Sequence, residues 1–585
     1  MRASFVPVAV ALVIAGGACE ARDAALPLTI GPVLLVPRGL LQSVARVTVR
    51  EYFAGPAACD APSGAVTGAG SPDATTTLSQ TGCTGGAVWC GSLQVATSDA
   101  ERVFGAEADD GNGAAIAVGC AQLVVDQQTQ PVAITMKRVV PAAVCGDGVL
   151  QPTEQCEPPG GPKDMVCDAA CHTREELLSS VDSTLGVPAP GKANPGDRSA
   201  PAMVWPGGAA PAGRFVAFWT DKTDPPDTHV ALRVLGDDLG ALPPNAAPAL
   251  AAGSVWLTSS SQFPSLPDPN NQQLPAVAFA ADARRTFVAF SDDSGGSFDI
   301  AMRTLDANYS AEQAAPIGVN GAGGAGEPGV QTHPSIALGT NDVAYVVWQS
   351  APQVGPGQIV GRTFDRTRTP PYGTQVVLSS GSSNQAPVVA ALSTGWVVAW
   401  QSGSDVVMRA VAPGGQPSGA SSVVSAGHHG VQDHPAIAAV GGGDDRMAIA
   451  WADHGQNGAD IVVQRFDATG APVGDSSTPV NDLVADGDQV TPALAASANG
   501  GFFAVAWLDT PSGHVRARLL DASSGFDFND VTGQDDEFQV SLVDGHTRGN
   551  PVAAVGGSGP FVAIAWEDQT PGAPGIYGRR FPLPP

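Results

Sequence analysis

The sequence predicts an all-β protein whose larger part is a seven-bladed β-propeller, and three observations lead to this prediction. A short strand pattern built on a proline recurs seven times, at intervals of 48 to 74 residues. A tryptophan usually closes the strand that follows. No stretch of ten residues has the hydrophobic spacing of an amphipathic helix. Repeats of this length indicate propellers or solenoids, and four short strands per unit favour a propeller.

The prolines and tryptophans define the seven units. The repeat prolines are Pro201, Pro275, Pro334, Pro387, Pro435, Pro492 and Pro551. We expect each of them to begin the first strand of its unit. The tryptophans are Trp219, Trp348, Trp400, Trp451, Trp507 and Trp566, and the second unit, "TFVAFSDD", places Ser291 at this position.

The propeller is expected to span residues 175–585 and to close its ring with a segment from its beginning. The last unit ends at its third strand, "GIYGRRFPLPP", so that a fourth strand is missing. The segment "EELLSSV" at 175–181 resembles "TQVVLSS" at 374–380, an outer strand of the third unit. We therefore predict that Leu177–Val181 supplies the missing strand, which removes an exposed sheet edge. A linker rich in proline and glycine, residues 183–198, lies inside this domain.

Residues 1–18 are predicted to form a secretory signal. Arg2 precedes an apolar run from Phe5 to Ile14, and small residues follow. The stretch "GGAC", Gly16–Cys19, resembles a bacterial lipobox, which implies lipidation of Cys19 and anchoring at the outer membrane. Simple cleavage and release to the exterior is the alternative. The expected location is extracellular or the outer membrane, with any membrane contact made only through the lipid.

Residues 26–141 are predicted to form a β-sandwich-like domain, because short valine-rich runs alternate with turn residues. Apart from Cys19 the chain has eight cysteines, all before residue 172, and an even number in an exported chain indicates disulfides. Four of them, Cys59, Cys83, Cys90 and Cys120, belong to this domain. They allow three pairings, and the sequence does not choose among them.

The stretch "CGDGVLQPTEQCEPPGGPKDMVCDAAC" at 145–171 contains the other four cysteines. Its first half, "CGDGVLQPTEQCE", resembles the Myxococcus cysteine-rich repeat, a small extracellular module. A segment of this size cannot bury a core of its own, so covalent links must hold it. The segment has no CxxC spacing, so it does not indicate a zinc site. We expect two disulfides among Cys145, Cys156, Cys167 and Cys171.

Three groups of polar residues are candidate sites. Two residues after each tryptophan position stand Asp221, Asp293, Ser350, Ser402, Asp453, Asp509 and Asp568, which either hold turns or form a carboxylate ring for a cation or sugar hydroxyls. An arginine recurs on the third strand and is expected to be architectural: Arg233, Arg303, Arg362, Arg409, Arg518 and Arg579. The densest polar cluster, with no recognised metal-ligand spacing, is His428, His429, Asp433 and His434.

The second unit also contains "SDDSGGSF", Ser291–Phe298, which resembles the Asp-box hairpin of sialidase-like propellers. This resemblance implies a fold element, and it leaves a glycan-acting enzyme as an alternative function. Such an enzyme uses a tyrosine nucleophile and acid residues. The tyrosines available in the later repeats are Tyr372 and Tyr577, and neither has an evident partner in the sequence.

The function that we expect is binding rather than catalysis. A rigid ring with variable polar loops suits recognition of a partner protein or a glycan. The alternatives are a sialidase-like enzyme and a purely structural surface component. The net charge of −27 repels phosphates and makes nucleic acid a poor partner. We expect a monomer, and no motif indicates a cofactor.

Overall fold

The computed structural model describes residues 27–30, 33–35, 45–138, 175–179 and 198–582, with gaps inside the longer ranges, the largest at 80–88, 240–254, 258–270 and 523–536. The chain divides into two compact units, the first made mainly of residues 1–144 and the second of the rest. Each is described by itself. Cys19, Cys83, Cys90, the whole 145–171 module and nearly all of the predicted linker lie outside the described residues.

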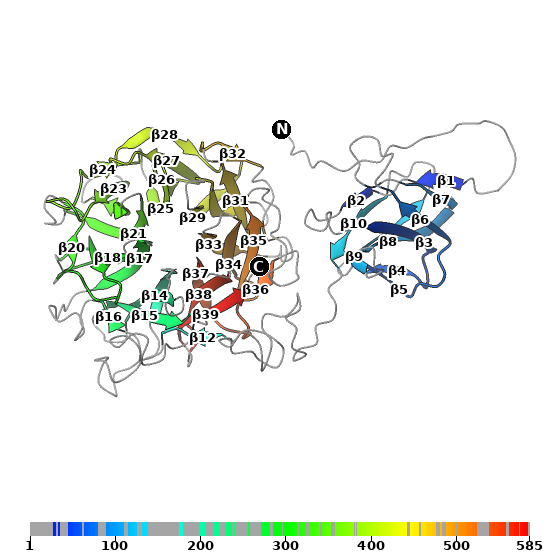
Figure 1. The fold of residues 1–585 in the computed structure, drawn as a ribbon, viewed down its shortest axis with the longest axis horizontal. Helices are drawn as coiled ribbons and strands as arrows, with labels where there is room; N and C mark the ends of the chain where they lie inside the picture. The colour runs from blue at the N-terminus through cyan, green and yellow to red at the C-terminus, as the bar shows by residue number, and fades with distance from the viewer. Residues whose placement is uncertain are drawn as a thin grey trace. The chain divides into compact units, whose positions relative to one another are not determined.

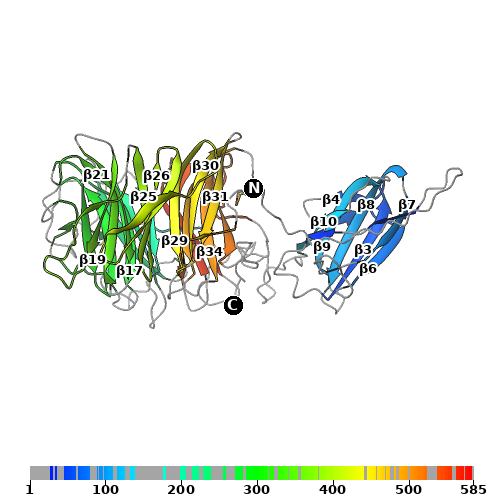
Figure 2. The ribbon, with the colours of Figure 1, turned by 90° about the horizontal axis from the view of Figure 1, so that it is seen from above.

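The first unit is a sandwich-like arrangement around one five-stranded sheet (Figure 2). The sheet has the order β11 (Lys137–Arg138), β9 (Ala115–Val125), β8 (Ser98–Asp109), β3 (Arg46–Phe53) and β6 (Ala74–Leu78). The smaller pairs are β1 (Pro27–Ile30) with β7 (Leu93–Ala96), β10 (Ala133–Thr135) with β2 (Val33–Leu35), and β4 (Ala58–Asp60) with β5 (Ala65–Thr67). Buried residues of β3, β8, β7 and β10 form one hydrophobic core, which explains the valine-rich runs.

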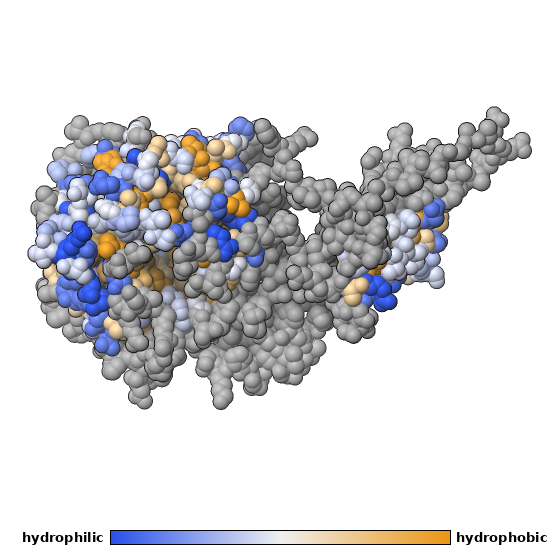
Figure 3. Space-filling model, turned by 45° about the horizontal axis from the view of Figure 1, so that its top comes forward, coloured by the Kyte–Doolittle hydropathy of each residue, from blue (hydrophilic) through white to orange (hydrophobic). Residues whose placement is uncertain are grey.

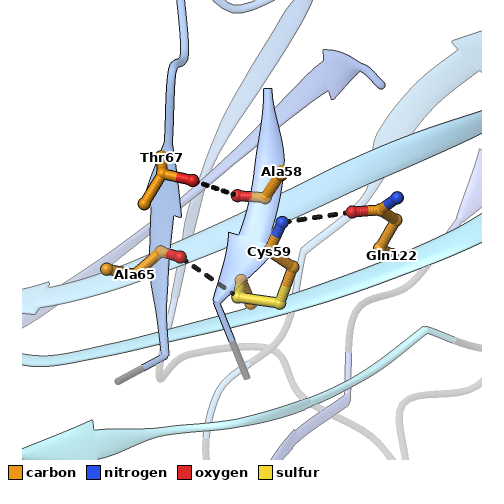
Figure 4. The surroundings of a disulfide bond; sticks show 6 residues. Ala58, Cys59, Ala65, Thr67 and Gln122 are labelled. Carbon is orange, nitrogen blue, oxygen red and sulfur yellow. Dashed lines mark hydrogen bonds between the residues drawn. A yellow bond between two sulfur atoms is a disulfide. The ribbon is translucent and has the colours of Figure 1, made fainter. Parts of the chain in front are cut away.

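A disulfide between Cys59 and Cys120 ties the β4–β5 hairpin to the large sheet (Figure 4). This bond selects one of the three pairings that the sequence left open. The backbone N–H of Cys59 donates to Gln122 Oε1 at 3.1 Å. Cys120 Sγ contacts the carbonyl oxygen of Ala65 at 3.5 Å, a van der Waals contact because a disulfide sulfur carries no hydrogen.

The second unit contains seven four-stranded sheets, which confirms the predicted seven-bladed propeller (Figure 1). Blades one to three are β13 (Arg198–Val204), β14 (Arg214–Asp221), β15 (His229–Gly236), β16 (Val255–Trp256); β17 (Gln272–Ala280), β18 (Arg285–Asp292), β19 (Asp299–Leu305), β20 (Ile317–Gly318); and β21 (Val330–Leu338), β22 (Ala344–Ala351), β23 (Gln358–Phe364), β24 (Val376–Val377).

The next three blades have the same antiparallel order. They are β25 (Asn384–Leu392), β26 (Gly395–Ser402), β27 (Asp405–Val411), β28 (Pro417–Val423); β29 (Val431–Ala439), β30 (Met447–Gly455), β31 (Gly458–Phe466), β32 (Pro472–Val473); and β33 (Gln489–Ala496), β34 (Phe502–Asp509), β35 (His514–Asp521), β36 (Phe538–Gln539). The first strands of all seven blades contact their neighbours in sequence around a closed ring.

The seventh blade is closed as the sequence predicted. It has the order β12 (Glu176–Leu177), β39 (Gly575–Pro582), β38 (Phe561–Asp568) and β37 (Arg548–Gly556), so an N-terminal strand completes the C-terminal sheet. Leu178 continues the pairing through its N–H to the Ile576 carbonyl at 2.8 Å. Its fully buried side chain packs with residues of the first and last blades. Both ends of the propeller are thus held in one sheet.

The repeat prolines do not begin strands, contrary to our expectation. Each lies three or four residues inside its first strand, at a β-bulge where two residues face one. Proline fits there because a bulge leaves its missing N–H without a ladder partner. The residue before each proline has a positive φ of 44–55° in all seven blades: Ala200, Leu274, His333, Ala386, His434, Thr491 and Asn550.

Each bulge faces a large buried side chain on the second strand. In six blades this is the repeat tryptophan, at most 1% exposed. In the second blade it is Phe290 and not Ser291, because the bulge of Leu274 and Pro275 lies between the pairs Gln273–Ser291 and Ala276–Ala289. The structure therefore shifts our alignment of that blade by one residue.

The outer strands contain a repeat that sequence reasoning missed. An apolar residue followed by serine or asparagine pairs with the third strand, and the polar side chain accepts a third-strand backbone N–H at 2.7–3.1 Å. The accepting residues are Ser179, Asn320, Ser379, Ser425, Asn481 and Ser541. The presence of Ser179 in this set places the closing segment in register with the ordinary outer strands.

The recurrent arginines are confirmed as architectural, and most of them donate to backbone carbonyl groups. In five blades the guanidinium donates at 2.6–3.1 Å to the outer strand of the preceding blade: Arg233 to Leu177 and Leu178, Arg362 to Val319 and Gly321, Arg409 to Leu378, Arg518 to Val480, and Arg579 to Val540. These arginines join each blade to the one before it. Within the described part of the chain, no helix has the length and apolar character of a membrane span.

Candidate functional site

The repeated aspartates serve the fold. Asp221, Asp509 and Asp568 are at most 3% exposed. Most of these carboxylates accept hydrogen bonds from the polar residue three positions before the proline of the same blade, as Asp453 Oδ1 does from Gln432 Nε2 at 3.1 Å and Asp509 Oδ1 from Gln489 Nε2 at 3.2 Å. The side chains therefore fasten the first strand to the second. This use supports the turn-holding alternative over a ligand-binding ring.

Asp293 is not the counterpart of the other aspartates, because register pairs Gln272 with Asp292 in the second blade. Asp293 lies one residue beyond β18. Its two carboxylate oxygens accept from the backbone N–H and the Nδ2 of Asn271, at 2.6 and 2.7 Å. In the second blade the position in the predicted ring therefore belongs to Asp292 and not to Asp293.

The predicted histidine cluster divides into three parts. His428 donates from Nδ1 to Asp453 Oδ2 at 2.5 Å and packs edge-on against Trp451. His429 is exposed to solvent. Asp433 lies instead between His434 and His454: its Oδ1 is 2.8 Å from His434 Nδ1, and its Oδ2 is 3.2 Å from His454 Nε2. His454 was not among the predicted site residues.

We call the two residues before each repeat proline, on the seven inner strands, the bulge ring. Figure 1 shows these strands around the centre of the propeller. The ring is formed by residues 199–200, 273–274, 332–333, 385–386, 433–434, 490–491 and 549–550. Its exposed side chains are His333, Gln385, His434 and Asn550. In three blades the backbone N–H before the proline donates to a side chain of the preceding blade.

One hexapeptide of the ring occurs twice. The third blade has "GVQTHP" at 329–334 and the fifth has "GVQDHP" at 430–435. The fold accounts for three of its residues: the glycine has a positive φ, the glutamine is buried, and the proline stands at the bulge. At Gly430, an added Cβ would lie 1.9 Å from the His454 carbonyl oxygen.

The valine and histidine of the hexapeptide have no such structural reason. Val330 and Val431 are 44% and 43% exposed, and both histidines are exposed. At the histidine position the other blades have alanine, leucine, alanine, threonine and asparagine, so the bulge itself accepts many side chains. A recurring exposed residue that the fold does not require indicates a functional role. Figure 3 shows one face of the propeller, on which small apolar groups lie among polar residues.

The electrostatics of the two histidines differ. The hydrogen bond to Asp433 raises the pKa of His434 above its usual value, burial opposes this, and the Asp433 charge adds to it. Burial lowers the pKa of His333, and the positive charge of His434 lowers it further. The two rings are therefore close enough to interact across the fourth blade.

Two other constellations that resemble catalytic sites also serve the fold. His514 Nδ1 is 3.1 Å from Ser541 Oγ, and its Nε2 is 2.9 Å from Asp544 Oδ1. Ser541 is fully buried, however, and already accepts the Val515 N–H, so substrate cannot reach this hydroxyl. At Tyr577, burial, Asp568 and Glu175 raise the pKa, which is the opposite of what a phenolate nucleophile needs.

Tyr372, the other tyrosine considered above, stacks under the Arg362 guanidinium at 4.2 Å. In the described residues, no three or more His, Cys, Asp or Glu side chains are arranged to hold a metal ion.

Comparisons with known proteins add little. No protein-family model matches the chain. No curated protein matches it either. Among solved structures, a protein of unknown function from Dyadobacter fermentans is similar with a TM-score of 0.39 and 12% identity, over 71% of this chain and 99% of that one. A sialidase described as Hadza microbial gives 0.35 and 11%, over 96% and 93%, and a polysaccharide lyase gives 0.35 and 10%, over 63% and 88%. Likeness at this level does not carry their activities to this chain.

Proposed function

We propose that this chain is an exported binding protein, and that the bulge ring of its propeller recognises a glycan or a partner protein. The observation that carries the proposal is the repeated hexapeptide. Seven copies of one structural unit show which positions the fold needs, and the exposed valine and histidine are not among them. Their repetition in two blades is therefore best explained by a shared contact with a ligand.

The polar composition of the ring favours a glycan. Ser199, Gln273, Gln385 and Asn550 carry neutral groups that donate and accept hydrogen bonds, as sugar hydroxyls require. A partner protein is the second candidate, because Val330 and Val431, in the same two inner strands as the histidines, offer exposed apolar surface. The catalytic-looking groups described above are engaged within the fold, which favours binding over catalysis.

Features of the sequence and the disulfide of the first unit both support export. The predicted signal at 1–18 and the even number of remaining cysteines favour an oxidising compartment, where the Cys59–Cys120 bond would persist. We propose an extracellular or outer-membrane location, with attachment through Cys19 if the lipobox is processed. The acidic net charge supports partners other than nucleic acid.

A thermal-shift screen of the full chain against mono- and oligosaccharides and peptides tests the proposal. A ligand at a hundred times its Kd should stabilise the propeller by about 2.7 kcal/mol. The double variant His333→Ala/His434→Ala should lose this stabilisation, whereas His429→Ala, which removes an exposed histidine outside the ring, should keep it. A ligand that stabilises the double variant as well as the original chain would move the site elsewhere, and a screen without any stabilising ligand would contradict binding of these classes.

A further inference from the structure

The two histidines of the repeated hexapeptide are held in the same way, each by the residue before it. His333 Nδ1 is 3.1 Å from Thr332 Oγ1, and His434 Nδ1 is 2.8 Å from Asp433 Oδ1. In the described part of the chain, neither ring has a partner at Nε2. Anchoring through Nδ1 fixes the orientation of an imidazole and leaves its other nitrogen for a ligand. The ring therefore presents two oriented Nε2 atoms on blades three and five.

The protonation of this pair suits a negative ligand. The hydrogen bond to Asp433 raises the pKa of His434, so this ring keeps a proton on both nitrogens to a higher pH than a free imidazole does. Asp433 itself is held ionised: burial raises its pKa, but the hydrogen bonds and charges of His434 and His454 outweigh this and lower it. His333 is more often neutral and can donate from Nε2 while its Nδ1 accepts from Thr332.

The remaining surroundings are nearly uncharged. β25 and β26, which lie between the two histidines around the ring, contain no ionisable residue, and neither do β17 and β33. The ionisable side chains on the other elements packed against β21 and β29 are Tyr345, Arg285, Asp292, Asp299, Arg303, Asp405, Arg409, Asp453 and His454. Several of these are engaged, as Arg285 is with Glu312 and Arg409 with Leu378. The equivalent position in the fourth blade, which lies between the other two blades in the ring, is Ala386.

We propose that His333 and His434 together bind one carboxylate group of an acidic ligand, each donating an Nε2–H to one carboxylate oxygen, with Val330 and Val431 contacting the carbon body next to it. This inference rests on the proposed function and specifies the ligand class for the same site. No covalent bond is made or broken when the ligand binds.

Two consequences follow from this arrangement. A bound carboxylate offsets the charge of His434 and favours the protonated form of His333, so it raises the pKa of His333. Affinity should increase as the pH falls and both rings gain protons, and should weaken as the pH rises and His434 loses its proton. The ligand carboxylate stays ionised throughout this range because its usual pKa is near 4.

The test follows the histidine ring signals of the full chain by NMR with ¹³C-labelled histidine. His333→Asn and His434→Asn assign the two sets of signals. The probes are glucuronate with its neutral counterpart glucose, and isobutyrate with isobutyramide, each across pH 5.5–8.5. We expect the acids, but not the neutral compounds, to shift both histidines and to raise the pKa of His333. His434→Gln should abolish the effect, and His429→Ala should not.

The outcomes separate the ligand sources and the two proposals. An effect of glucuronate alone supports an acidic sugar, and an effect of isobutyrate alone supports a non-sugar acid. Neutral compounds that shift the histidines as strongly as the acids would overturn the carboxylate inference and leave the bulge ring as a binding site. Acids that shift neither histidine would also overturn the carboxylate inference. The proposed function would fail as well only if the thermal-shift screen had found no ligand.

Discussion

Replacing Leu178 by alanine is expected to lower the free energy of unfolding of the propeller by about 2–5 kcal/mol. The side chain is fully buried and packs among core residues from both the first and last blades. Its loss therefore leaves a cavity at the point where the ring closes. Urea unfolding followed by tryptophan fluorescence measures the effect, since Trp89 is the one tryptophan of ten outside the propeller.

The adjacent Leu177 provides a matched control. It lies in the same closing strand and is 39% exposed, so Leu177→Ala should change the free energy of unfolding far less. Equal effects of the two variants would mean that the closing segment contributes only its backbone pairing. A negligible effect of Leu178→Ala would mean that the ring is not closed by β12 in solution.

The second large effect is expected at the tryptophan that faces each bulge. Trp507→Ala should cost about 3–5 kcal/mol, because a fully buried indole is removed from a packed core. Trp507→Phe should cost much less, since the second blade has Phe290 at this position. The Trp507 Nε1 also has no partner among the described residues, so its removal leaves no acceptor unsatisfied.

Trp400→Phe is the informative comparison. Trp400 Nε1 donates to Asn384 Oδ1 at 3.0 Å, and a phenylalanine would leave this buried oxygen without that donor. An unsatisfied buried group costs about 1–3 kcal/mol, so Trp400→Phe should be more destabilising than Trp507→Phe in the same unfolding experiment. The reverse order would show that packing, and not this hydrogen bond, decides the choice of tryptophan.

Much of the propeller could be predicted because its repeats are visible in one chain. The interval of the prolines and the similarity of 175–181 to an outer strand were enough for seven blades and for their closure. The bulges could not be predicted, since the sequence does not show that two residues face one across a strand pair. The same omission placed Ser291 opposite the bulge instead of Phe290, and Asp293 in the position that belongs to Asp292.

The candidate site was only partly predictable. The sequence grouped His428 with Asp433 and His434 in one polar cluster. In the structure His428 instead forms a hydrogen bond with Asp453. These residues are close in the sequence, but the turn before β29 separates His428 from Asp433 and His434. His333 was missed because it stands alone in its loop. Aligning "GVQTHP" with "GVQDHP" within the chain would have found it.

The central claim is that the glutamine of the repeated hexapeptide serves the fold and the histidine serves a ligand. The most direct measurement compares the thermal unfolding of Gln331→Ala/Gln432→Ala with that of His333→Ala/His434→Ala. Gln331 accepts from Trp348 Nε1 and Gln432 donates to Asp453, and both are at most 1% exposed. The glutamine variant should melt clearly below the original chain, and the histidine variant within about a degree of it, because alanine already stands at this position in blades one and four. A histidine variant that melts as low as the glutamine variant would contradict the claim and make the histidines part of the fold.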